Sequence, residues 1–163
     1  MAGGFAFRGR VREDFKLSTG TWVRVGMLRA RLLTELGDIA LDVVVAGEGR
    51  ERVAVLLFPN LAACRTLAGS GASVSPIADA AVRQAFADRL ARYNAAYPGS
   101  STSIFRALIL DSPPSLEGME ITDKGSINQR AVLRHHAELV SELYAEVPPA
   151  QVAVIEIDSA PDR

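Results

Sequence analysis

The clearest structural signal in the sequence is residues 9–23, which read Gly-Arg-Val-Arg-Glu-Asp-Phe-Lys-Leu-Ser-Thr-Gly-Thr-Trp-Val. Residues 15–17 and 21–25 are rich in apolar and β-branched side chains, which is typical of short strands. Ser18 and Thr19 lie between them with Gly20, which is free to take a positive φ at a tight turn. This stretch therefore predicts a β-hairpin.

The chain on either side predicts a mixture of strands and helices. Leu28, Leu32, Leu33 and Leu36 recur at helical spacing, and Gly37 stands where such a helix would end. The other predicted elements are strands at 5–12, 39–46, 53–58 and 104–110, helices at 61–68, from Ser75-Pro76 and from Asn128, and a last strand at 152–157. We therefore predict an α+β fold, in which an N-terminal β-hairpin is followed by a small mixed three-stranded sheet flanked by helices.

Composition restricts the classes of protein. With 163 residues, 48% of them hydrophobic, the chain has enough apolar material for one compact domain. It carries 18 Lys and Arg against 19 Asp and Glu, so its net charge attracts neither nucleic acid nor an anionic membrane. There is no apolar run of about 20 residues to cross a membrane. The single cysteine, Cys64, excludes an internal disulfide and fits a reducing compartment. We expect a soluble, cytoplasmic protein.

The N-terminal end is locally basic. Between Arg8 and Arg31 there are seven basic and two acidic residues. Two interpretations stay open at this point: the basic side chains face phosphates, or they are the solvated sides of strands and a helix.

Residues 9–23 resemble the hinge motif of the acyl-adenylate-forming (AMP-binding) superfamily. The amino-acid sequence of residues 13–23 resembles the feruloyl-CoA synthase branch of that superfamily in particular. Residues 120–130, Glu-Ile-Thr-Asp-Lys-Gly-Ser-Ile-Asn-Gln-Arg, lie where that superfamily carries its late lysine motif. The two motifs stand in the family's order, and the resemblance covers residues 7–145. The chain thus resembles the mobile C-terminal domain of an AMP-forming acid–CoA ligase.

This resemblance implies a two-step reaction. A carboxylate, in this branch an aromatic acid such as ferulate, attacks ATP to give an acyl-adenylate and release pyrophosphate, and the thiol of CoA then displaces AMP to leave a thioester. The mobile domain swings between the two steps, presenting its lysine to the first and its hairpin to the second. The resemblance implies ATP and CoA as cofactors, and an upstream N-terminal adenylation domain as partner, which would also bind Mg²⁺. No metal site is expected in this chain.

The resemblance also assigns roles to single residues. A lysine ammonium near the carboxylate and the α-phosphate would stabilise the charge that develops during the displacement. The assigned residues are Lys124 as the catalytic lysine, Arg12 as the hinge, Arg10 near the ribose or phosphate of the adenylate, and Gly20, Thr21 and Trp22 along the pantetheine arm of CoA.

One departure from the family pattern concerns the lysine. In the more common form of the family motif, the catalytic lysine occupies the position of Ser126, two residues after Lys124. In an extended loop these two side chains point to the same side, so that Lys124 would reach the same oxygens. A tightly turned loop would defeat that substitution, and Ser126 would then mark a site without a catalytic lysine.

The remaining polar residues receive no role at this stage. His135 and His136 are adjacent on a predicted helix and should face different directions, which argues against a shared metal. Asp42, Glu48 and Glu51 show no spacing typical of paired catalytic carboxylates and are predicted to lie on the surface.

The family's phosphate loop and Tyr-x-Thr-Gly-Asp motif do not precede Gly9. We therefore expect a piece of a longer enzyme that is inactive alone, with a hinge remnant at 1–12, the mobile domain at 13–147 and a tail at 148–163. The alternative is a free-standing, non-enzymatic module that binds CoA, a carrier arm or a protein partner through its basic hairpin. The reading frame upstream of Met1 distinguishes the two.

Overall fold

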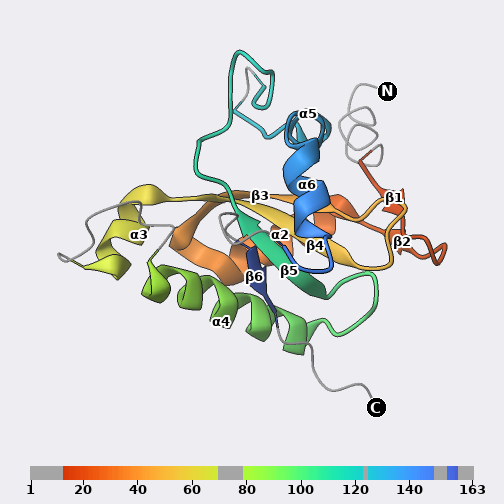
Figure 1. The fold of residues 1–163 in the computed structure, drawn as a ribbon, viewed down its shortest axis with the longest axis horizontal. Coiled ribbons are helices and arrows are strands. Elements are labelled where there is room, and N and C mark those ends of the chain that lie inside the picture. Colours follow the sequence, from red (N-terminus) through yellow and green to blue (C-terminus); the bar gives the residue numbers. More distant parts are fainter. Residues whose placement is uncertain (1–12, 70–78, 123–124, 149–153, 158–163) are drawn as a thin grey trace, which may run out of the picture.

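A computed structural model describes residues 13–69, 79–122, 125–148 and 154–157 (Figure 1). The predicted strand at 5–12, the predicted helix start at Ser75-Pro76, and the residues Arg10, Arg12 and Lys124 lie outside the described residues.

The predicted hairpin and first helix are confirmed. Strands β1 (Phe15–Lys16) and β2 (Trp22–Val23) pair antiparallel, with Phe15 opposite Val23. Gly20 has a φ of +87°, the conformation that the turn between these strands requires of it. Helix α2 (Val25–Leu36) follows directly, and Gly37 ends it with a φ of +62°.

A four-stranded mixed sheet forms the centre of the molecule. Its strands lie in the order β3 (Ala40–Ala46), β4 (Val53–Pro59), β5 (Ile104–Ile109) and β6 (Val154–Glu156). The β4–β5 pair is parallel and the other two pairs are antiparallel. The three predicted central strands are therefore confirmed, and the strand predicted in the tail becomes the fourth strand of the same sheet.

Helices cover both faces of this sheet (Figure 1). Helices α2 and α4 (Ala80–Ala96) pack on the face that carries Val43, Val45 and Val55. Helices α5 (Gln129–His135) and α6 (Ala137–Leu143) pack on the opposite face, with Val44 and Leu56. Alternate strand residues point to opposite faces, so a sheet buried on both sides needs strands that are apolar throughout, as β4 is. A short helix α3 (Leu61–Ala68) and a 3₁₀ turn η1 (Gly37–Ile39) complete the described fold.

Two predicted helices differ from the structure. Helix α4 begins at Ala80, where the Asp79 carboxylate accepts hydrogen bonds from the N–H groups of Ala81 and Val82 and caps the helix. The single helix predicted from Asn128 is two helices, because His136 leaves the helical conformation with φ −107° and ψ 30°.

Every helix in the described part of the chain is too short or too polar to cross a membrane.

Candidate functional site

The hairpin is fixed to the sheet through the turn between β3 and β4. Ser18 N–H donates to the carbonyl of Arg50 at 2.8 Å, and Gly49 N–H donates to the carbonyl of Lys16 at 3.1 Å. Phe15 and Val23 are buried against the core. Because neighbouring strand residues alternate in direction, the opposite face of the hairpin points outward.

That outward face carries an aromatic ring and a cation. Trp22 is 51% exposed, so it is not the core residue that an isolated tryptophan usually is. Lys16 Nζ lies 5.2 Å from the centroid of the Trp22 ring. A Cβ placed on Gly20 would meet no atom within 4 Å, so the backbone at the hairpin turn is open to an approaching ligand. Gly20, Thr21 and Trp22 are consecutive residues at the turn end of the hairpin, and their role in binding stays a prediction.

The loop that holds the proposed lysine is a closed turn and not an extended segment. Ile121 and Ile127 form an antiparallel bridge, and Thr122 N–H donates to the carbonyl of Ser126 at 2.8 Å. Gly125 N–H donates back to the carbonyl of Thr122 at 2.8 Å, and Gly125 has a φ of +81°. Of the two alternatives, the contacts of Thr122, Gly125 and Ser126 favour the tightly turned loop. Lys124 itself lies outside the described residues, so its catalytic role stays a prediction.

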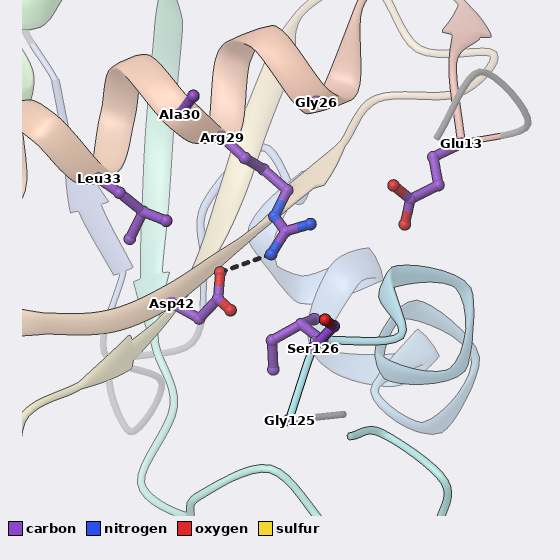
Figure 2. A pocket seen from close by; sticks show the side chains of 9 residues that line it. Glu13, Gly26, Arg29, Ala30, Leu33, Asp42, Gly125 and Ser126 are labelled. Atoms are coloured by element: carbon purple, nitrogen blue, oxygen red, sulfur yellow. Dashed lines mark hydrogen bonds and ion pairs between the residues drawn. The ribbon is translucent and has the colours of Figure 1, made fainter. Parts of the chain in front are cut away.

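A cavity of about 440 Å³ lies between this loop, helix α2 and strand β3. Figure 2 shows Arg29 reaching from α2 toward Asp42, with Ser126 and Glu13 also facing the space. Glu13 is the first described residue after the predicted hinge position, Arg12. The structure therefore places Glu13, which follows the predicted hinge residue, at the same cavity as Gly125 and Ser126 of the predicted lysine motif.

The Arg29–Asp42 ion pair forms the wall of this cavity. Arg29 Nη2 lies 2.8 Å from Asp42 Oδ1, and Arg29 Nε donates to the carbonyl of Val43 at 3.1 Å. The Asp42 side chain is 18% exposed, so it is more enclosed than the surface position predicted for it, whereas Glu48 and Glu51 are exposed as predicted. The structural reason is the ion pair with Arg29 of α2, which the spacing between acidic residues in the sequence does not reveal.

Internal contacts occupy the described part of the basic N-terminal end. Arg24 pairs with Asp14 at 3.4 Å, and the Arg31 guanidinium lies 4.3 Å from the centroid of the Tyr97 ring. Together with the pairing of Arg29, these contacts favour a structural role for the described arginines over one at a phosphate.

The two histidines also differ from expectation. His135 Nδ1 and His136 Nε2 both approach Glu120 Oε2, at 3.0 and 3.3 Å, although helical neighbours should diverge. The break in the helix at His136 makes this convergence possible. Within the described ranges there is no group of three or more His, Cys, Asp or Glu residues suited to a metal ion.

This chain belongs to the family of AMP-binding enzyme C-terminal domains, which matches residues 16–148. No curated protein matches it in sequence. The fold is similar to those of carboxylic acid reductase adenylation domains.

Solved structures with this likeness include the following three, each with 22% sequence identity. The didomain of adenylation and PCP domains from Segniliparus rugosus, in complex with AMP, has a TM-score of 0.64 over 82% of this chain. The adenylation domain of the Segniliparus rugosus enzyme, with AMP and a co-purified carboxylic acid, has a TM-score of 0.65 over 84%. The adenylation domain from Mycobacterium chelonae has a TM-score of 0.66, also over 84%. The chain spans only 17% to 20% of these longer chains.

Proposed function

We propose that this chain is the mobile domain of an AMP-forming acid–thiol ligase of the feruloyl-CoA synthase type. In this proposal residues 1–12 belong to the hinge, residues 13–147 form the moving domain, and the rest is a tail whose strand completes the sheet. ATP, an aromatic carboxylate and CoA bind mainly to a larger partner domain, which also supplies the Mg²⁺ site. The isolated chain is then inactive.

The observation that carries this proposal is that two chemically different surfaces are fixed to the same strand pair. The outward face of the hairpin, with Lys16 and Trp22, is tied to the β3–β4 turn. The closed loop at 121–127 precedes helix α5, and Gln129 at the start of that helix is hydrogen-bonded to Val45 of β3. A domain that swings as one body needs this arrangement, because each half of the reaction then uses a different preformed surface.

Charge supplies the chemistry of the first step. The ammonium of Lys124 would stabilise the negative charge that develops on the α-phosphate and the leaving pyrophosphate. Because the turn between Thr122 and Ser126 removes the strand-like equivalence of Lys124 and Ser126, the long Lys124 side chain would have to reach these oxygens from its own position. Intact adenylation in Lys124→Ala would instead mark the Ser126 position as a site without a catalytic lysine. Arg10 would add a forked donor to the adenylate. The hairpin would serve the second step, in which the exposed backbone at Gly20 and the Trp22 ring line the path of the pantetheine arm.

The likeness to carboxylic acid reductase domains, one of them solved together with a PCP domain, gives a specific second candidate for the thiol. The acceptor would be a thiol on a carrier domain in place of free CoA. The adenylation step is the same in both cases, so the two candidates differ only in the second half of the reaction.

The experiment joins the chain to the adenylation domain encoded upstream and supplies ATP, Mg²⁺ and a panel of acids that includes ferulate, benzoate and acetate. Pyrophosphate release measures adenylation, and thioester formation is followed with CoA and with a carrier protein. The proposal predicts release with ferulate and transfer to CoA. Pyrophosphate release followed by transfer of the acyl group to the carrier protein but not to CoA favours the carrier thiol as acceptor. A gene that starts at Met1 without such a domain, together with direct binding of CoA to the chain, would favour a free-standing binding module.

A further inference from the structure

A buried carboxylate lies at the base of the loop at 121–127. Glu120 is only 4% exposed, and burying a carboxylate is costly unless its oxygens have partners. Its Oε1 accepts a hydrogen bond of 2.8 Å from the Ser115 N–H. Its Oε2 lies 3.0 Å from His135 Nδ1 and 3.3 Å from His136 Nε2. Both oxygens are therefore satisfied from two sides, by the segment before the loop and by the end of helix α5.

These partners keep the carboxyl group ionised. Burial by itself raises the pKa of Glu120, but the Ser115 hydrogen bond, the His135 hydrogen bond and the charge on His136 together hold it below the usual range. A carboxylate is an acceptor only, so it can satisfy the Ser115 N–H and both imidazoles at once. A neutral amide in its place would present an N–H₂ group to one of these partners.

The backbone of Glu120 also links the segment before the loop to the start of helix α5. Its N–H donates to the carbonyl of Ser115, and its carbonyl accepts from Asn128 N–H at 2.7 Å. Residue 120 thus joins the start of the 121–127 loop to the N-cap of α5. The segment before it packs tightly on the helix, since a Cβ on Gly118 would lie 2.7 Å from Cε1 of His135.

We propose that Glu120 is a positioning residue, whose contacts with His135 and His136 fix the closed loop at 121–127 on the end of helix α5 in the orientation needed for adenylation. This rests on the proposed function of that loop. The role is indirect: the carboxylate is buried among protein partners, and it acts by holding the turn formed by Thr122, Gly125 and Ser126.

The variants Glu120→Gln and Glu120→Asp test this proposal, with Glu117→Gln as a control at an exposed position in the segment that precedes the loop. Amide hydrogen exchange in the 163-residue chain reports the loop directly. Because a hydrogen bond to a charged group is lost, the Thr122, Gly125 and Ser126 amides should exchange about 10- to 100-fold faster in Glu120→Gln. The core amides of β4 should keep their protection, and Glu117→Gln should change neither.

The same variants, joined to the adenylation domain, separate a positioning role from a general structural one. Glu120→Gln should slow pyrophosphate release about 10- to 100-fold. Thioester formation from a preformed acyl-adenylate should stay within about twofold, because the hairpin is untouched. Glu120→Asp keeps the charge and should recover part of the adenylation rate.

Unchanged exchange in the loop amides of Glu120→Gln overturns the proposal. So does an unchanged rate of adenylation in Glu120→Gln when Lys124→Ala abolishes that rate. If Lys124→Ala also leaves adenylation intact, the proposed function of the loop itself is wrong, and the two failures are thereby distinguished.

Discussion

The side-chain carbonyl of Gln129 accepts a hydrogen bond of 2.9 Å from the backbone N–H of Val45, which ties the first turn of α5 to the middle of β3. Strand β3 lies at an edge of the sheet, and an edge strand exposes backbone groups without a neighbouring strand. Two further groups on this edge also have side-chain partners: Val43 N–H donates to Asp42, and Val43 C=O accepts from Arg29. The side chains of Gln129, Asp42 and Arg29 therefore satisfy backbone groups on the edge of β3. Arg29 and Asp42 also line the cavity, and Gln129 follows the loop.

The Gln129 contact should contribute measurably to stability. Gln129→Met keeps the shape of the side chain and removes the acceptor, leaving the buried Val45 N–H without a partner. We expect the free energy of unfolding to fall by about 1–3 kcal/mol. Urea unfolding of the 163-residue chain measures this, with Gln84→Met as the control, since Gln84 is exposed on α4 and donates to Asp88. Equal effects of the two substitutions would contradict the role given to the β3 edge.

Arg29 should matter more to stability than an exposed arginine with a similar ion pair. Arg29→Met removes both the pair with Asp42 and the bond to the Val43 carbonyl, and should cost about 1–3 kcal/mol. Arg92→Met breaks a pair with Glu35 in which the arginine is 65% exposed, and should cost less than about 1 kcal/mol. Thermal unfolding of both variants tests the difference, and a larger loss for Arg92→Met would refute it.

Two glycines should respond in opposite ways to alanine. Gly20 has a positive φ, so Gly20→Ala should destabilise the hairpin by about 1–2 kcal/mol although nothing lies within 4 Å of the added methyl. Gly26 lies in helix α2 with equally open space, so Gly26→Ala should stabilise the chain by about 0.5–1 kcal/mol. Chemical denaturation of the two variants side by side shows whether each substitution raises or lowers the free energy of unfolding. Stabilisation by Gly20→Ala would show that the turn differs from the one described.

The lowered pKa of Glu120 predicts how stability depends on pH. A carboxyl whose pKa is lower in the folded than in the unfolded state contributes stability above its unfolded value, near 4.5, and loses it as the pH falls through the folded value. The wild-type chain should therefore lose stability below about pH 4.5 more steeply than Glu120→Gln. Unfolding free energies measured between neutral pH and pH 3 test this, and parallel curves for the two proteins would be inconsistent with the ionised, bonded carboxylate.

The elements that local sequence patterns determine could be predicted. The hairpin, α2, α3 and the strands β3, β4 and β5 each carry their own periodicity or turn residue, and all are present near the predicted bounds. The hairpin end with Gly20, Thr21 and Trp22 was located for the same reason. The break at His136 was missed because the apolar stripe continues across it, and only the contacts of both histidines with Glu120 mark it.

Contacts between distant residues could not be predicted in the same way. Arg29 and Asp42 are 13 residues apart and Gln129 and Val45 are 84 apart, so no spacing along the chain relates them. The turn of the loop at 121–127 depends on a bridge and two backbone hydrogen bonds, which a motif compared residue by residue does not contain.

In the proposed function the two surfaces serve different halves of one reaction, and the chain offers a matched pair of residues to test this division. Its two lysines are Lys16 on the hairpin and Lys124 in the late motif. The decisive measurement is the rate of each half-reaction in the joined protein with Lys124→Ala, Lys16→Ala and Arg12→Pro, the last of which restricts φ at the hinge. We predict that Lys124→Ala slows adenylation about 100- to 1,000-fold, as expected for removing one charge-stabilising group. Lys16→Ala and Arg12→Pro should leave adenylation intact and slow only thioester formation. Loss of both half-reactions in every variant, or intact adenylation in Lys124→Ala, would show that the two surfaces do not divide the reaction in this way.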